Sequence, residues 1–281
     1  MLSRLLSDLR DRWHPLWRLR QSALFRHFQQ RFDFTVDRHI PSTGLKVAVK
    51  LMRDASWIVG ADALEPEIRS AFTLVIQAFR PKIFWDVGAN IGFYSWFVRQ
   101  HDGVERVVMF EPDPTNFALL QRTIRTNSIT NCDPRNVALA ESSGEATFLL
   151  DRASGATGSL ESSSQLGNDH SLHYAYGMGD SIRCQTVSVD DLIAAGTPAP
   201  SLMKIDVEGA ESQVLAGAVK CLEQARPILI VETTDETLCK RLKAGGYEIF
   251  QLDGGNILAL PPGLDREPIA QKFSVRPVAR A

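Results

Sequence analysis

Apolar residues along most of this chain follow two alternating periods. Short, nearly continuous apolar runs predict buried strands at 82–87, 106–111, 201–207, 226–232 and 247–252. Between these runs, apolar residues recur at helical spacing, which predicts helices at about 91–100, 114–127, 190–195, 210–224 and 235–244. Strands that alternate with helices in this way are typical of an α/β domain with a mostly parallel sheet and helices on both faces.

Residues 34–59 have a different pattern. The short runs FTVD, LKVAVKLM and SWIV, separated by PSTG and RDA, predict a small antiparallel unit. Residues 65–79 then have the spacing of a helix, which Pro81 prevents from continuing. We therefore divide the chain into an N-terminal arm and strand unit (1–59), an α/β domain (60–260) and a C-terminal tail (261–281).

Three further strands are expected within the domain. The runs at 135–141 and 145–150 are joined by Ser-Ser-Gly and are expected to form a strand and its hairpin partner. Another strand is expected at 181–189. The segment between them, 151–180, contains five glycines and six serines, together with His170, His173, Tyr174 and Tyr176. Because a loop this long is usually functional or disordered, we favour a lid on the substrate side.

The first 32 residues form a basic arm. Seven arginines accompany only two aspartates there, a net charge of +5, so that the rest of the chain carries −7 of the overall −2. Leucine, tryptophan and phenylalanine recur at helical spacing along the arm. Such a helix either packs on the domain with its arginines in water, which we favour, or contacts an anionic membrane surface or a protein partner.

Composition is that of an ordinary soluble protein, with 44% hydrophobic and 23% charged residues. The four cysteines form no close pair and follow no secretory signal, so we expect reduced thiols and a cytoplasmic location. No apolar run approaches the roughly 18 residues that a membrane span requires.

The stretch WDVGANIGFYSWF, residues 85–97, joins a predicted strand to a predicted helix through a glycine turn. This is the usual opening of a nucleotide-binding α/β domain. A dinucleotide fingerprint needs a second glycine where Asn90 stands, since a side chain there crowds a diphosphate. A Walker A motif is excluded because no GKS or GKT follows. The turn therefore predicts a nucleotide-like ligand without a diphosphate.

Four predicted parallel strands each finish on a carboxylate: Asp86, Glu111, Asp206 and Glu232. Ligands of open α/β sheets bind outside the carboxyl ends of the strands, where Glu111 is well placed to accept both hydroxyls of a ribose. Four carboxylates at one mouth favour a cation and repel phosphates. S-adenosylmethionine, with a ribose, a sulfonium and no phosphate, fits this set. The alternative for any single carboxylate is that it caps the next helix.

These segments resemble the FkbM family of S-adenosylmethionine-dependent methyltransferases. The motifs DVGANIGFYS, FEPDPTNFALLQRTIRTN, NVALAESSGEATF, SVDDL, MKIDVEGAESQVLAGA and RPILIVE follow one another as they do in that family, over roughly residues 60–252. The resemblance implies a class I methyltransferase fold, with a seven-stranded sheet whose last strand is antiparallel. The N-terminal arm and the C-terminal tail lie outside it.

The resemblance also implies a set of cofactor-binding residues. The methionine end of S-adenosylmethionine would be held by Asp86, Gly88, Ala89, Asn90 and Gly92, with Tyr94 close by in the same motif. Glu111 would hold the ribose. The adenine would lie near Pro112 and Asp113 and near the segment from Asn136 to Ala138.

Methyl transfer requires the acceptor, the methyl group and the sulfur to be collinear, and an alcohol must also lose its proton. Asp206, at the end of the fourth strand, and Glu208, two residues on, are our candidates for the base or for polar anchors of cofactor and acceptor. Glu211 is expected to be a charge at a helix N-terminus, and His170 and His173 are weaker candidates for a base. We assign no metal ion.

We expect an O-methyltransferase that acts on a hydroxyl of a small molecule such as a sugar, a glycan or a polyketide-like product. Carboxyl methylation is the alternative, and so is an inactive cofactor-binding homologue that acts through a partner. A nicotinamide-dependent oxidoreductase is disfavoured by Asn90. Nucleic acid is disfavoured as an acceptor because the net charge of −7 outside the arm provides no basic surface, and because the fourth strand ends in DVEG.

Overall fold

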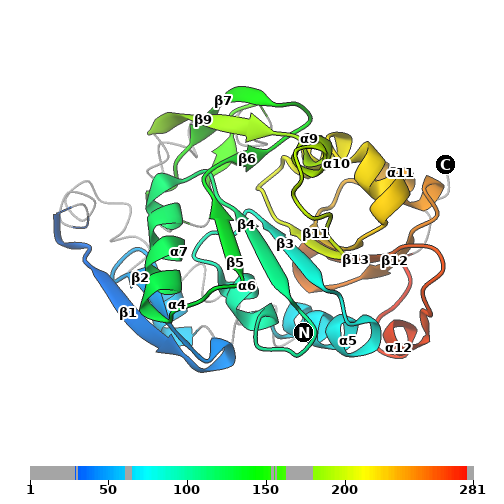
Figure 1. Ribbon diagram of the computed structural model, residues 1–281, viewed down its shortest axis with the longest axis horizontal. Helices are drawn as coiled ribbons and strands as arrows, with labels where there is room; N and C mark the ends of the chain where they lie inside the picture. The colour runs from blue at the N-terminus through cyan, green and yellow to red at the C-terminus, as the bar shows by residue number, and fades with distance from the viewer. Residues whose placement is uncertain are drawn as a thin grey trace.

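The centre of the fold is a seven-stranded sheet of order β12-β13-β11-β10-β3-β4-β5 (Figure 1). The computed structural model describes residues 29, 31–60, 65–152, 155, 157–162 and 180–276. The strands of this sheet are β3 (Ile83–Val87), β4 (Arg106–Phe110), β5 (Cys132–Arg135), β10 (Leu202–Ile205), β11 (Ile228–Glu232), β12 (Glu248–Gln251) and β13 (Asn256–Leu260). Only β13 runs antiparallel to its neighbours, which confirms the expected sheet with an antiparallel last strand.

Residues along the central strands alternate between two hydrophobic cores, one on each face of the sheet. In β3, Phe84 belongs to the first core, and Trp85 and Val87 belong to the second. In β10, Leu202 and Met203 divide in the same way. Successive side chains of a strand point to opposite faces, so a continuous apolar run is the pattern of a strand that is buried on both sides.

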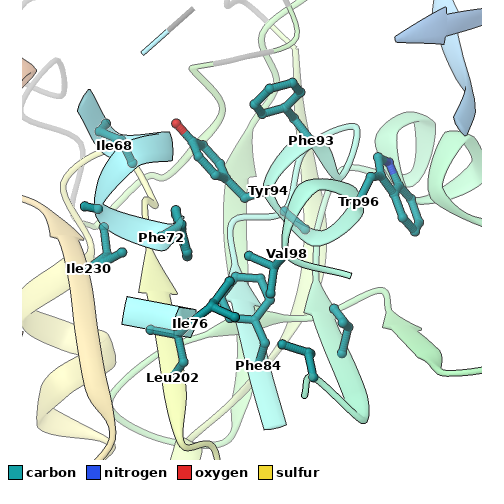
Figure 2. Close-up of a cluster of buried hydrophobic side chains, with 14 of the residues drawn as sticks. Ile68, Phe72, Ile76, Phe84, Phe93, Tyr94, Trp96, Val98, Leu202 and Ile230 are labelled. Atoms are coloured by element: carbon teal, nitrogen blue, oxygen red, sulfur yellow. The ribbon is translucent and has the colours of Figure 1, made fainter. Parts of the chain in front are cut away.

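Helices cover both faces. The first core contains side chains of α5 (Pro66–Phe79), α6 (Phe93–Val98) and α7 (Pro114–Thr126). Figure 2 shows Ile68, Phe72 and Ile76 of α5 facing the sheet. The second core contains side chains of α9 (Val189–Ala194), α10 (Glu211–Ala216) and α11 (Glu236–Ala244).

The helix expected at 210–224 is divided into two pieces. After α10 the chain turns at Gly217 and then forms a π-helical turn at Cys221–Ala225. Gly217 packs directly on another segment, because a Cβ built there would lie 2.2 Å from the backbone oxygen of Ala140. This close approach requires glycine at the break.

A two-stranded antiparallel unit precedes the α/β domain and packs on α7 (Figure 1). β1 (Thr35–Ile40) pairs with β2 (Leu45–Lys50) across a 3₁₀ turn at Pro41–Thr43. The Ala48 N–H of β2 donates to Thr123 Oγ1 of α7 at 2.9 Å. The expected antiparallel unit is therefore confirmed for its first two strands.

The run SWIV, expected as a further strand of this unit, is instead part of helix α4 (Ala55–Gly60). A short apolar run does not distinguish a strand from a helix by its periodicity. Here the Trp57 N–H donates to the backbone oxygen of Asp54, which starts the helix, and the side chains of Trp57 and Ile58 pack against the first core.

A second sheet, drawn at the top of Figure 1, has the order β6-β9-β7-β8. Its strands are β6 (Ala138–Leu139), β7 (Gly144–Leu149), β8 (Ser159–Leu160) and β9 (Ser181–Val187). The expected hairpin between 135–141 and 145–150 is wrong, because β9 lies between β6 and β7. Asn136 interrupts the first run: its amide donates to the backbone oxygens of Glu111 and Pro112 at 2.8 and 3.0 Å, so β5 ends at Arg135.

Residues 261–276, which we assigned to a tail, return to the domain. Helix α12 (Glu267–Ala270) contacts α5, and Ile269 and Phe273 are buried in the first core. Residues 1–28 and 163–179, which include most of the basic arm and most of the expected lid, lie outside the described residues. In the described ranges, no helix is both long enough and apolar enough to cross a membrane.

Candidate functional site

The candidate site lies where β3 and β10 are neighbours in the central sheet. The chain continues from β3 to β4 and β5 on one side of this point, and from β10 to β11 on the other. Ligands of open α/β sheets bind at such a switch point, outside the carboxyl ends of the strands. Three segments meet there: the glycine turn after β3, the segment after β4 and the segment after β10.

The turn after β3 depends on residues with positive φ. Gly88, Asn90 and Gly92 have φ values of 78°, 53° and 85°. A Cβ on Gly88 would lie 1.9 Å from the backbone oxygen of Asp206, so only glycine fits between the ends of β3 and β10. Asparagine tolerates the left-handed region better than most side chains, which explains how the turn forms without a second glycine.

Glu111 follows β4 and is buried beneath this turn. Its Oε2 accepts the Asn90 N–H at 2.7 Å, and its Oε1 accepts the Asp113 N–H at 2.8 Å. Burial outweighs these bonds and raises the pKa of Glu111 to about 7. Each carboxylate oxygen still has a lone pair for a donor group of a ligand.

One cavity is lined by eight of the thirteen site residues expected from the sequence. They are Gly88, Asn90, Glu111, Pro112, Asp113, Ala138, Asp206 and Glu208. Apolar walls are added by Val87, Phe110, Val137, Leu139, Phe148, Leu160, Val207 and Ala210. None of the described residues that line the cavity is Lys, Arg or His, so its charge favours a cation over an anion.

Five expected residues do not line this cavity: Asp86, Ala89, Gly92, Tyr94 and Asn136. Ala89 and Gly92 belong to the glycine turn itself. Asn136 is used to hold the backbone after β4, as described above. The structure therefore gives these three a supporting position around the cavity.

A buried lysine links the strand-end carboxylates. Lys204 of β10 lies 2.6 Å from Asp206 Oδ2 and 4.8 Å from the ring centre of Tyr94. Asp86 Oδ2 accepts the Ser95 N–H and hydroxyl at 3.1 and 2.7 Å, whereas its buried Oδ1 has no hydrogen-bond partner among the described residues. A buried carboxylate oxygen without a donor is rare, although Asp86 itself does not line the cavity.

Asp206 and Glu232 lie close enough for the protonation of one to affect the other. Burial and the charge of Asp206 raise the pKa of Glu232 to about 9. Although burial opposes it, the charge of Lys204 lowers the pKa of Asp206 below its usual value. At pH 7, Glu232 therefore carries the proton and Asp206 carries the charge.

Glu208 lies at the border between this cavity and a neighbouring one. Its φ is 54°, a strained conformation of a kind that clusters at functional sites. Glu208 is exposed to solvent, so its burial is only partial. Partial desolvation, followed by repulsion from Asp206 and Glu211, raises the pKa of Glu208 to about 7. A carboxylate with this pKa is suited to accept a proton near neutral pH.

The neighbouring cavity is lined mainly by carboxylates, hydroxyls and glycines: Ser159, Glu208, Gly209, Glu211, Ser212, Glu232, Thr233, Thr234, Asp235, Gly254 and Gly255. Glu211 begins α10 and its Oε1 accepts the Gly209 N–H at 3.0 Å, as expected for a charge at a helix N-terminus. In the described part of the chain, no group of three or more His, Cys, Asp or Glu residues is arranged to hold a metal ion.

The segment after β7 contributes cavity residues that sequence reasoning placed elsewhere. Asp151, Gly155, Gly158 and Leu160 line the same cavity as Glu111, although we expected 151–180 to lie on the substrate side. Among the described residues of this segment, Ser159 alone lines the neighbouring cavity. His170, His173, Tyr174 and Tyr176 lie outside the described residues.

Asn116 of α7 also lines the cavity and was missed. A signal for it exists in the sequence. Asn116, Leu119, Leu120 and Thr123 are the buried face of α7, at the spacing i, i+3, i+4 and i+7. A polar residue on the buried face of an amphipathic helix needs a polar partner, and such a position is a candidate for a site.

Comparison with known proteins identifies relatives of the α/β domain. The family model described as "Methyltransferase FkbM domain" matches residues 86–249. The chain is 27% identical to the hexuronic acid methyltransferase AglP of Haloferax volcanii over 158 residues, which are 56% of this chain and 58% of that protein. It is 30% identical to the 31-O-demethyl-FK506 methyltransferase FkbM of Streptomyces tacrolimicus over 201 residues, 64% of this chain and 71% of that protein.

Among solved structures, a methyltransferase FkbM from Methylobacillus flagellatus KT aligns with a TM-score of 0.46 and 20% identity. The alignment covers 64% of this chain and 44% of that chain. The matched family domain begins at Asp86 and ends within β12, so the N-terminal unit and β13 lie outside it.

Proposed function

Because the chain belongs to the FkbM methyltransferase family, we propose that it transfers the methyl group of S-adenosylmethionine to a hydroxyl oxygen of a small molecule, such as a sugar, a glycan or a polyketide-like product. Its central sheet, with the antiparallel β13, is the class I methyltransferase fold. The observation that carries the proposal is the acidic cavity around Glu111, next to a second cavity that shares Glu208.

The residues of the first cavity fit the cofactor. The carboxylate of Glu111 would accept the ribose hydroxyls through its remaining lone pairs. The apolar walls beside Ala138 would hold the adenine. The ionised Asp206, which lines the cavity, adds negative charge toward the sulfonium and the ammonium group of the methionine end.

Glu208 is the proposed general base. When bound, S-adenosylmethionine would supply a methyl group on a positive sulfur: the new C–O bond would form as the C–S bond breaks, and neutral S-adenosylhomocysteine would leave. An alcohol oxygen must lose a proton in this process, and Glu208, at the border of the two cavities, would take it. Its pKa of about 7 matches that task, whereas Glu232, with a pKa of about 9, is protonated at pH 7 and would not act as the base.

The second cavity is the proposed acceptor site. Its hydroxyls and its carboxylates at Glu208, Glu232 and Asp235 can bond several hydroxyls of a polyhydroxylated molecule. The charge of Asp235, and of Glu208 when it is ionised, would repel an anionic acceptor, although one relative acts on a hexuronic acid. This favours a neutral hydroxyl acceptor over a carboxylate, and a small molecule over a nucleic acid.

The test is a transfer assay with methyl-labelled S-adenosylmethionine and paired acceptors that differ only in charge, such as matched hexosides and hexuronides. We expect label in an alkali-stable ether on a neutral acceptor, and a rate about 10²–10³-fold lower in Glu208→Gln. Label in an alkali-labile ester on the uronate, unaffected by Glu208→Gln, would establish carboxyl methylation instead. Binding of S-adenosylhomocysteine without transfer to any acceptor would identify an inactive homologue.

A further inference from the structure

A buried arginine from the N-terminal unit reaches the wall of the proposed cofactor cavity. Arg53 follows β2 and is only 6% exposed. Its guanidinium donates to both carboxylate oxygens of Asp54, with Nε to Oδ1 at 2.7 Å and Nη2 to Oδ2 at 3.1 Å. Arg53 precedes the matched family domain, which begins at Asp86.

The same guanidinium makes a further contact that the pair with Asp54 does not require. Arg53 Nη2 donates to Asn116 Oδ1 at 2.7 Å, and Asn116 Nδ2 donates to the backbone oxygen of Gly155 at 3.2 Å. Asn116 and Gly155 both line the cavity that contains Glu111. The contacts therefore run from the N-terminal unit through α7 to the segment after β7.

Packing fixes this arrangement as firmly as the hydrogen bonds do. Gly155 has a φ of 69°, and a Cβ built on it would lie 2.5 Å from Nε and from Cζ of Arg53. The guanidinium thus lies directly against the backbone of Gly155. A buried, bidentate arginine is held more rigidly than a lysine would be, because its planar fork loses less freedom with each hydrogen bond that it forms.

We propose that Arg53 is a positioning residue for the cofactor, which sets the wall of the cavity through Asn116 and Gly155 and makes the N-terminal unit part of the cofactor site. This inference rests on the proposed function, since it concerns S-adenosylmethionine and its product. It assigns a role to a segment that the family domain does not include.

The charge of Arg53 adds a second effect. Two charged side chains act on Glu111: Asp113 raises its pKa and Arg53 lowers it. Without Arg53, the pKa of Glu111 rises further above its ordinary value, and the carboxylate that would accept the ribose hydroxyls is lost at a higher pH. A merely structural arginine would leave this pH dependence unchanged.

The test is calorimetric titration with S-adenosylhomocysteine between pH 6 and pH 8. The proteins compared are the wild type, Arg53→Gln, Arg53→Lys and Asn116→Ala. The control is Arg122→Gln, which removes the exposed ion pair of α7 with Asp37 of β1 and so loosens the same unit far from the cavity. Asn116→Ala leaves the pair of Arg53 with Asp54 intact, so it serves if the arginine variants fold poorly.

We expect affinity to fall about tenfold in Arg53→Gln and in Asn116→Ala, and to stay within about threefold in Arg122→Gln. In Arg53→Gln, the pH at which half of the affinity for S-adenosylhomocysteine is lost should move upward. Arg53→Lys keeps the positive charge but not the planar guanidinium, so it should restore this pH midpoint without restoring the affinity. Hydrogen exchange at residues 157–162 should accelerate in Arg53→Gln and Asn116→Ala but not in the control.

The outcomes separate the two proposals. If the wild type binds S-adenosylhomocysteine and both Arg53→Gln and Asn116→Ala bind it equally well with the same pH midpoint, the role of Arg53 is refuted while the proposed function stands. If the folded wild type does not bind S-adenosylhomocysteine, the proposed function fails first, and this inference fails with it.

Discussion

Replacement of Glu111 by glutamine should separate the stability of the empty protein from its affinity for the cofactor. Burial raises the pKa of Glu111 from an ordinary 4.5 to about 7. The folded protein therefore binds more protons than the unfolded chain between these two values, and its free energy of unfolding falls as the pH rises through that window. The shift corresponds to about 3 kcal/mol of stability that is present below pH 4.5 and lost above pH 7.

Glu111→Gln removes this cost but introduces another. A neutral amide needs no ionisation, which stabilises the variant at pH 8 relative to the wild type. However, its NH₂ group faces one of the two backbone N–H donors, from Asn90 or Asp113, and leaves that donor without an acceptor. An unsatisfied buried donor costs about 1–3 kcal/mol, so the two effects nearly cancel at pH 8. Between pH 5 and pH 7, stability should depend less on pH in the variant.

Affinity for the cofactor should fall in Glu111→Gln even though stability at pH 8 is nearly unchanged. The ribose hydroxyls need the acceptor oxygens and charge of Glu111, and hydrogen bonds to charged groups contribute about 1.5–3 kcal/mol. Affinity for S-adenosylhomocysteine should therefore fall about 10- to 100-fold in Glu111→Gln at pH 8. In the wild type, affinity should weaken by up to about tenfold per pH unit below pH 7, because the empty site takes up a proton.

The assays are urea unfolding between pH 5 and pH 8 and calorimetric titration with S-adenosylhomocysteine. The reasoning is refuted if Glu111→Gln unfolds much more readily at pH 8 yet keeps the affinity of the wild type. Glu111 would then serve only as an acceptor for the backbone of the glycine turn.

Three further predictions concern the catalytic base, the glycine turn and the buried lysine. Glu208→Gln should lower the single-turnover rate about 10²–10³-fold and leave the Kd for S-adenosylhomocysteine within about threefold. The rate of the wild type should rise with pH up to about 7. An unchanged rate in Glu208→Gln would rule out this base. Gly88→Ala should lower the free energy of unfolding, measured by thermal unfolding, by at least about 2 kcal/mol. Gly196 also has a positive φ but nothing within 4 Å of a Cβ built on it, so Gly196→Ala should lower it by only about 1 kcal/mol. Equal losses would contradict the close approach of β3 and β10. Lys204→Met removes the cation beside buried Asp86 and half-buried Asp206 and should cost about 3 kcal/mol in urea unfolding, against less than about 0.5 kcal/mol for the exposed Lys82→Met. A small loss at both positions would show that Lys204 does not offset the charge of these carboxylates.

The sequence predicts the central sheet well because its strands are buried on both faces. A continuous apolar run between helices has few alternatives, and β3, β4, β10, β11 and β12 all lie where such runs occur. Prediction failed where a run was short. SWIV became α4, and the hairpin at 135–150 was wrong because its pairing depends on β9, more than 30 residues farther along. The spacing of apolar residues indicates which side chains are buried, but it does not indicate which strands pair with each other.

The candidate site was predictable in part for the same reason. Strand-end residues such as Glu111 and Asp206 share one edge of a parallel sheet, so strand assignment alone brings them together. Arg53 and Gly155 could not be found in this way. Gly155 lines the cavity from outside the central sheet, and Arg53 contacts the cavity wall through Asn116 of α7 and the backbone of Gly155.

The central claim is that the cavity at the ends of β3, β4 and β10 holds S-adenosylmethionine. A crystal structure of the protein with S-adenosylhomocysteine tests this most directly. We expect the ribose hydroxyls within hydrogen-bond distance of the Glu111 carboxylate, the adenine beside Ala138 and the sulfur directed toward Glu208. A ligand bound elsewhere, or a ribose that does not contact Glu111, would contradict it.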